Sequence, residues 1–189
     1  MLEIRIHGRG GQGVVTAAEL LSVAAFRDGH EAQAFPSFGS ERMGAPVVSY
    51  CRIADTPIRL REPVSAPDAV IIVDATLLHH VDVFGGLTAG GYVLINSTRS
   101  VDDLGVWDLV ERSDRGRIVA VAATDLARHH VGRPLPNVCL LGAFAAQTGA
   151  VTLASIESAV MDRFRGPIAE ANVAAARAAY HAVSEGQHA

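Results

Sequence analysis

The sequence predicts an α/β fold, namely a Rossmann-like, doubly wound, mostly parallel sheet with a β-hairpin insertion and a helical C-terminal part. Three observations predict it. The stretches AVIIVD and RIVAVAA are nearly continuous apolar runs rich in β-branched residues, which is typical of parallel strands covered on both faces. Stretches with helical periodicity lie between the strand-like ones. The last third of the chain shows helical patterns only.

The expected strands are short apolar stretches, and the expected helices lie between and after them. The strands are predicted at residues 4–7, 31–35, 47–53, 69–74, 92–96 and 118–122. The helices are predicted at 11–27, 77–83 (a short one), 125–130, 138–148, 153–164 and 169–182. Strands that alternate with helices indicate right-handed crossovers between parallel neighbours.

One segment interrupts this alternation. GAPVVSYCRIADTPIRL, residues 44–60, alternates apolar and polar residues with period two and contains the turn-forming Asp55-Thr56-Pro57. We therefore expect an antiparallel hairpin attached to the sheet. Further along, Asn137 is the expected N-cap of the helix at 138–148, and Gly149 its expected C-terminal stop. No repeat or linker appears, so residues 1–189 are expected to form a single domain.

Composition excludes several classes of function. The net charge is −4 with no block of like charge, which argues against nucleic acid or a membrane surface as a partner. All sixteen basic residues are arginine, so a P-loop lysine, a Schiff-base lysine and a pyridoxal phosphate anchor are excluded. Cys51 and Cys139 stand far apart, whereas an iron–sulfur cluster needs four ligands. With no signal region or long apolar span, we expect a reduced, cytoplasmic protein.

The stretch HGRGGQGVVT, residues 7–16, is the first candidate site. Gly8, Gly10 and Gly13 match G-x-G-x-x-G between a predicted strand and a predicted helix, whose first amides would form an anion site. The third glycine would let the helix pack on the strand. A dinucleotide enzyme also needs an acidic residue at the end of the second strand, but that strand ends QAFP and Glu31 lies at its start. NAD or FAD binding is thus disfavoured. A phosphate or coenzyme end group, a partner's backbone and a purely structural turn remain as alternatives.

The second candidate is FPSFGSERMGAPVVSY, residues 35–50. It combines small residues with the adjacent Glu41 and Arg42. Because it leaves the end of the second strand, it should lie at the same sheet edge as the glycine loop, where open α/β sheets bind ligands. Arg42 would offer a forked donor to phosphate or carboxylate. A solvated loop with a local ion pair is the alternative.

Five segments in order, HGRGGQGV, FGSERMGAPV, PDAVIIVDATLL, GGYVLINSTR and LPNVCLLGAFAAQTG, resemble the gamma subunit of the 2-oxoacid:ferredoxin oxidoreductase family over residues 3–165. That family includes enzymes for pyruvate, 2-oxoglutarate, branched-chain 2-oxoacids, indolepyruvate and phenylglyoxylate. The resemblance implies a gamma-type subunit, inactive alone, of an enzyme that oxidatively decarboxylates a 2-oxoacid to the acyl-CoA. The electron acceptor would be ferredoxin or an NAD-linked carrier.

The resemblance also implies a division of cofactors among subunits. Thiamine diphosphate, magnesium and the iron–sulfur clusters would belong to thiamine-binding and ferredoxin-like partners. This chain would contribute to coenzyme A binding and to closure of the active site, without a catalytic residue of its own. The positions carried over as cofactor-binding are Gly10, Gly11, Gln12, Gly13, Gly39, Ser40, Glu41, Arg42 and Gly44. Met43 stands where the family often has a second arginine.

Polar residues that follow other strands complete the candidates. Asp74, Asn96, Ser97 and Thr124 should reach the same sheet edge, as helix caps more often than as ligands; Asn96 is included as cofactor-binding. The pairs at 79–80 and 129–130 are histidines, but adjacent helical residues point about 100° apart, so no metal site is predicted.

His7 is expected to support the glycine loop and not to act as a general base. The small residues around Gly142 fit either core packing or a contact with another subunit. Two further functions stay open: a free-standing dinucleotide-binding dehydrogenase and a non-catalytic assembly subunit.

Overall fold

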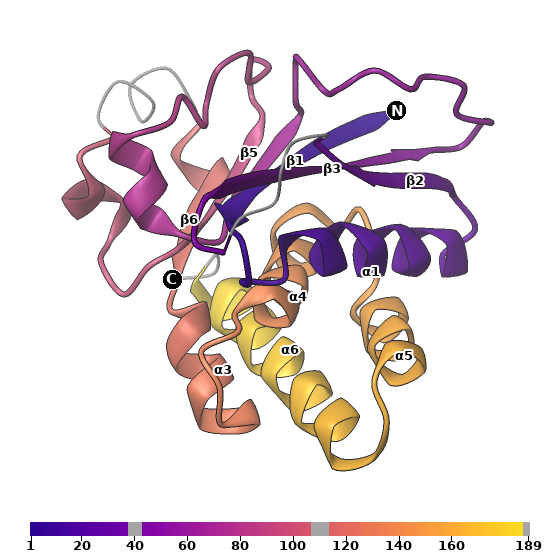
Figure 1. Ribbon diagram of the computed structural model, residues 1–189, viewed down its shortest axis with the longest axis vertical. Coiled ribbons are helices and arrows are strands. Elements are labelled where there is room, and N and C mark those ends of the chain that lie inside the picture. The colour runs from indigo at the N-terminus through magenta and orange to yellow at the C-terminus, as the bar shows by residue number, and fades with distance from the viewer. Residues whose placement is uncertain (38–42, 107–113, 187–189) are drawn as a thin grey trace.

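The computed structural model describes residues 1–37, 43–106 and 114–186, and its centre is a six-stranded mixed sheet (Figure 1). The strand order is β2-β3-β1-β4-β5-β6. The strands are β1 (Leu2–Arg9), β2 (Glu31–Pro36), β3 (Pro46–Ala54), β4 (Ala69–Ile72), β5 (Tyr92–Asn96) and β6 (Ile118–Val121). Four of them, β1, β4, β5 and β6, are parallel neighbours, as predicted.

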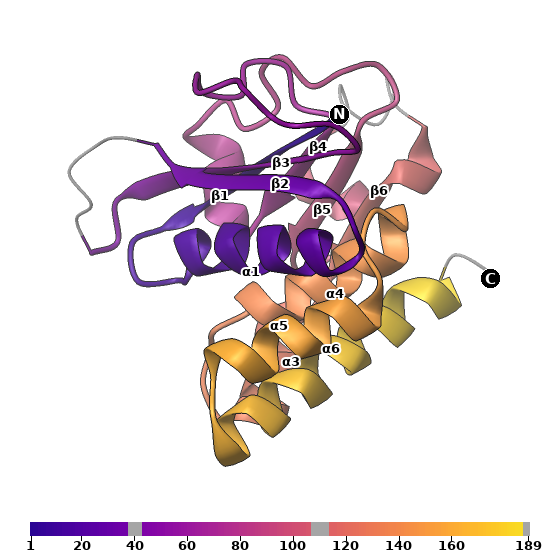
Figure 2. The same cartoon turned by 90° about the vertical axis from the view of Figure 1, so that its right-hand side faces the viewer.

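All the α-helices of the described residues lie on one face of the sheet, and irregular segments cover the other (Figure 2). The helices are α1 (Val14–Arg27), α3 (Ala123–Val131), α4 (Asn137–Thr148), α5 (Leu153–Arg163) and α6 (Gly166–Gly186). On the opposite face, η1 (Ala75–His79) and η2 (Val101–Leu104) pack Leu77 and Leu104 against Val70 and Ile72 of β4. A third short turn, η3 (Arg115–Arg117), precedes β6. Both faces of the parallel strands are therefore buried, which explains their apolar sequences.

Helix α4 is the centre of the helical layer. Ten of its twelve residues are buried, and α6 packs directly against it. A Cβ atom at Gly142 would lie 2.1 Å from the backbone oxygen of Ala176 in α6, so glycine is what allows this approach. Of the two interpretations of the small residues around Gly142, core packing within the chain is the one the structure shows.

The antiparallel part of the sheet differs from the prediction. It consists of β3 paired with β2 on one side and with β1 on the other. The residues after the Asp55-Thr56-Pro57 turn form no strand. The physical reason is that both edges of β3 are already occupied, so no edge is left for a second arm. The hairpin is thus β2–β3.

Several helix boundaries differ from the prediction, and among them α3 and α6 are longer at both ends than expected. Asn137 is the first residue of α4 and not its N-cap, whereas Gly149 ends α4 in the left-handed conformation as predicted. The helix expected at 77–83 is the 3₁₀ turn η1, two residues earlier. Helix α1 begins at Val14 instead of Gly11, because Gly13 with φ 73° is not helical. Among the described residues, no helix combines the length and the apolarity needed to cross a membrane.

Candidate functional site

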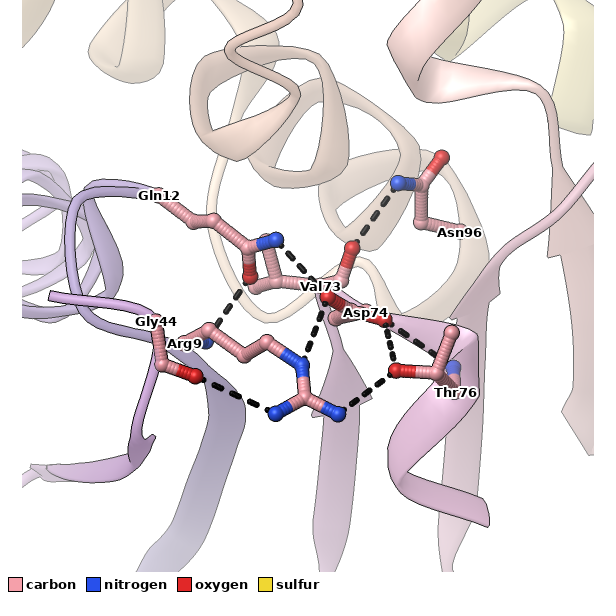
Figure 3. Close-up of polar contacts among 7 residues, drawn as sticks. All are labelled: Arg9, Gln12, Gly44, Val73, Asp74, Thr76 and Asn96. Atoms are coloured by element: carbon pink, nitrogen blue, oxygen red, sulfur yellow. Dashed lines mark hydrogen bonds and ion pairs between the residues drawn. The ribbon is translucent and has the colours of Figure 1, made fainter. Parts of the chain in front are cut away.

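The candidate site lies at the carboxyl ends of β1 and β4. These two strands are parallel neighbours, but the chain leaves β1 toward α1 on one face and leaves β4 toward η1 on the other. This is a topological switch point, where open α/β sheets form the crevice that binds ligands. At this switch point the side chains of Arg9, Gln12, Asp74 and Thr76 contact one another (Figure 3).

The glycine loop between β1 and α1 uses its glycines for different purposes. Gly11 and Gly13 have φ of 91° and 73°, the left-handed conformation that favours glycine. Close packing of helix on strand was expected from Gly13, but it belongs to Gly8, where a Cβ atom would lie 2.5 Å from Cγ2 of Val14. Gly13 instead approaches Asn137, whose side-chain amide donates to the Gly13 carbonyl at 3.3 Å. The start of α4 thereby supports the loop.

The end of the second loop lies beside the glycine loop, as predicted. The Gly10 amide donates to the carbonyl of Ala45 (2.9 Å), and the Gly44 amide donates to the carbonyl of Gly10 (3.1 Å). Met43 forms an isolated parallel β-bridge with Gly10. The Met43 sulfur would lie 2.6 Å from a Cβ atom added at Gly11. The remaining residues predicted from this loop, Gly39, Ser40, Glu41 and Arg42, lie outside the described residues.

Arg9 connects the two loops to the end of β4. It was not predicted as a site residue. Its guanidinium lies 3.2 Å from Asp74 through Nε and donates to the Gly44 carbonyl (3.1 Å). It also donates to the Thr76 hydroxyl at 2.8 Å. All three nitrogens of the guanidinium bind protein groups, and its charge is paired with Asp74, so Arg9 is not a free cation for a phosphate (Figure 3). An arginine set between glycines at a strand end was the signal that could have indicated it.

Asp74 is the residue on which these contacts converge. Its Oδ2 accepts from the Gln12 side chain (2.8 Å) as well as facing Arg9. Its Oδ1 accepts from the backbone amide (3.0 Å) and the hydroxyl (2.6 Å) of Thr76. Burial by itself would raise the pKa of Asp74, but the hydrogen bonds from Thr76 and Gln12 and the charge of Arg9 lower it. Asp74 is therefore an anion at neutral pH.

Gln12 and the start of α1 define what the loop can still bind. The Gln12 side chain accepts from the Arg9 amide (2.8 Å) and donates to Asp74, so both of its polar atoms are bound to protein groups. No side chain caps α1, and the amides of Val14 and Val15 have no acceptor within the described ranges. Free amides at a helix start favour an anion. The first turn of α1 is therefore a candidate position for an anion.

Asn96, Ser97 and Thr124 reach the same edge but bind protein groups. The Asn96 side chain donates to the Val73 carbonyl and to the Thr124 hydroxyl (both 2.8 Å). It also accepts from the Thr124 amide at 3.1 Å. The Ser97 hydroxyl accepts from the Arg99 amide at 2.9 Å. These contacts link β4, β5 and α3, and the cofactor-binding role of Asn96 stays a prediction.

Titratable groups elsewhere offer little redox chemistry. Both cysteines are buried, and burial raises the pKa of Cys51 and of Cys139 to about 12, so they stay thiols. Residues 1–37, 43–106 and 114–186 contain no group of three or more histidine, cysteine or acidic side chains that could hold a metal ion. The two cysteines also lie on separate elements, β3 and α4.

The strand order argues against dinucleotide binding in the usual mode. In that mode, the acidic residue for the ribose stands at the end of the strand next to β1. Here β3 lies between β1 and β2, so the end of β2 is about 10 Å away. That end is Pro36, and Glu31 lies at the opposite end of the strand. At the switch point itself, the side chains of Gln12 and Arg9 bind Asp74.

Comparisons with known proteins extend over nearly the whole chain. The family model of the pyruvate ferredoxin/flavodoxin oxidoreductases matches residues 3–182. The pyruvate/ketoisovalerate oxidoreductases common subunit gamma of Thermococcus kodakarensis is 44% identical over 181 residues, which cover 96% of each chain. The crystal structure of pyruvate oxidoreductase subunit PORC from Thermotoga maritima shares 35% identity and a TM-score of 0.80 over 95% of each chain.

A more distant structure shares the fold. The 2-oxoglutarate:ferredoxin oxidoreductase of Magnetococcus marinus was solved with 2-oxoglutarate, coenzyme A and succinyl-CoA bound. It matches with a TM-score of 0.75 over 98% of this chain and 31% of that chain. At 16% identity, this likeness concerns the fold alone.

Proposed function

This chain belongs to the pyruvate ferredoxin/flavodoxin oxidoreductase family as a gamma subunit, and from that premise we propose its part in the reaction. Within a multi-subunit 2-oxoacid oxidoreductase, the chain contributes to coenzyme A binding and to closure of the active site. Thiamine diphosphate with magnesium and the iron–sulfur clusters belong to the thiamine-binding and ferredoxin-like partners. Ferredoxin or an NAD-linked carrier accepts the electrons.

The observation that carries this proposal is the joining of the two loops at one edge of the sheet. The hydrogen bonds between Gly10 and residues 44–45 place the second loop beside the start of α1. The free amides of Val14 and Val15 suit a phosphate group such as those of coenzyme A. The 2-oxoglutarate:ferredoxin oxidoreductase that shares this fold at 16% identity was solved with coenzyme A bound.

The residues of this chain bind and enclose; they do not supply the chemistry. Thiamine diphosphate, when bound to its own subunit, provides the electron sink for decarboxylation. The loops would orient the coenzyme so that its thiol meets the acyl group, and they would keep water out. The common gamma subunit of Thermococcus kodakarensis is shared by enzymes for pyruvate and ketoisovalerate. That sharing supports placing the choice of 2-oxoacid on other subunits.

A specific observation favours the assembly subunit as second candidate. Met43 is an apolar side chain that is 87% exposed at the joined loops, and a partner subunit that packs there would bury it. On that interpretation the loops contact protein and no coenzyme, and replacing a loop residue disrupts the complex without affecting coenzyme A.

Replacing Arg42 with alanine in the assembled complex separates the two. If Arg42 binds a coenzyme phosphate, Arg42→Ala raises the KM for coenzyme A about tenfold, the loss of one charge-assisted contact, while the KM for the 2-oxoacid is unchanged. Arg59→Ala, an exposed arginine on another segment, is the matched control. An unchanged KM for coenzyme A together with loss of subunits during purification supports the assembly role.

A further inference from the structure

We infer that Asp74 is a positioning residue that holds the glycine loop and residues 43–45 in one fixed arrangement and thereby sets the affinity for coenzyme A. The part that concerns coenzyme A rests on the proposed function. The structural part rests on the contacts of Asp74, which add to the backbone hydrogen bonds between Gly10 and residues 44–45.

Asp74 touches the glycine loop directly at two side chains. Gln12 donates to its Oδ2 at 2.8 Å, and Arg9 lies 3.2 Å from the same oxygen. Gln12 in turn accepts from the Arg9 amide, so the carboxylate, Gln12 and the end of β1 form a closed ring of contacts. The carboxylate of Asp74 thus binds two side chains that lie 62 and 65 positions earlier in the chain.

Asp74 reaches the second loop through Arg9. The guanidinium that faces Asp74 donates with its other nitrogens to the Gly44 carbonyl and to Thr76, which Asp74 also binds. Gly44 has φ of 78°, so it is the turn that directs the chain into β3. Without the carboxylate, Arg9 keeps no charged partner among its described contacts, and the Gly44 carbonyl loses an anchored donor.

Asp74 cannot itself be the ligand contact. A carboxylate offers about four acceptor positions, and the contacts of Asp74 with Arg9, Gln12 and Thr76 occupy that number. Its side chain is 16% exposed, and as an anion it would repel a phosphate. The role left is to orient groups that do touch the coenzyme. A displacement of about 1 Å in such groups is enough to change rates and affinities strongly.

The test is Asp74→Asn in the assembled oxidoreductase. Asparagine keeps the shape but places an amide donor against the donors of Arg9 or Gln12. We expect the KM for coenzyme A to rise about five- to tenfold, with kcat and the KM for the 2-oxoacid within about twofold. Hydrogen exchange at the amides of Gly10 and Gly44, which bond across the two loops, should accelerate. Asp125→Asn, which breaks the exposed ion pair with Arg128 on α3, is the control that changes neither.

A second variant guards against simple misfolding. Arg9→Lys keeps a cation for Asp74 but loses the fork that reaches Gly44 and Thr76 together, so exchange at the Gly44 amide should rise more than exchange at Gly10. In a double-mutant cycle, Arg9→Ala and Asp74→Asn should change the KM for coenzyme A less than additively, because they remove one shared interaction.

Each outcome identifies which idea fails. If Arg42→Ala raises the KM for coenzyme A and Asp74→Asn only lowers thermal stability, Asp74 is purely structural and the inference is wrong. If exchange at Gly10 and Gly44 accelerates while neither variant affects coenzyme A, the coenzyme role of the loops is wrong. Acceleration together with the selective rise in KM supports both.

Discussion

At the scale of single residues, His7 shows how the interior of the sheet controls protonation. Its side chain is buried, and its Nε2 has no hydrogen-bond partner in the described part of the chain. Burial, with a smaller contribution from the charge of Arg5, lowers the pKa of His7 from 6.5 to about 4. His7 is therefore neutral at physiological pH, which suits the predicted role of loop support and not that of a proton carrier.

This environment predicts a dependence of stability on pH. The unfolded state binds a proton at His7 below pH 6.5 and the folded state only near pH 4, so the free energy of unfolding falls as the pH drops through this window. The loss attributable to His7 should approach about 2 kcal/mol at pH 4.5. Urea unfolding of the wild-type chain and of His7→Gln between pH 7.5 and 4.5 measures it. Equal pH dependence in the two proteins would contradict the prediction.

At the scale of elements, the close contact between α4 and α6 provides a direct test of the helix packing. In Gly142→Ala the added methyl group would collide with the Ala176 carbonyl, which is rigid helix backbone, so α6 must move. We expect a loss of about 2–3 kcal/mol in unfolding free energy. Gly186→Ala is the control, since no atom lies within 4 Å of its added Cβ, and it should be nearly neutral. A neutral Gly142→Ala would show that the helices are further apart.

The elements also show how far the sequence can predict the structure. Apolar runs identified the parallel strands, and Gly149 and the position of the glycine loop followed from local chemistry. The insertion of β3 between β1 and β2 did not, because pairing of distant strands leaves no local pattern. Asp74 was predicted at this sheet edge, whereas its pairing with Arg9 was not. Only the adjacency of β1 and β4 brings the two side chains together.

At the scale of the whole molecule, the helices and the joined loops occupy different parts of the sheet. One face of the sheet carries the helices, the carboxyl edge carries the joined loops, and the described residues provide no metal site and no accessible thiol. On the proposed function, this chain influences how the coenzyme is held and leaves the choice of 2-oxoacid to other subunits. The choice of acid and the affinity for coenzyme A should therefore be separable between subunits.

Exchanging gamma subunits between complexes tests this separation. If the gamma subunit of an oxidoreductase is replaced by this chain, the ratio of kcat/KM for pyruvate to that for a branched 2-oxoacid should change by less than about twofold, because we propose that other subunits make the contacts that discriminate the acid. The KM for coenzyme A should instead follow the gamma subunit, and Asp74→Asn in the exchanged chain should raise it further. The measurement is steady-state kinetics of the hybrid with both acids. A ratio that follows the gamma subunit would mean that this chain reaches the substrate, and the loops would then have to be placed at the acid itself.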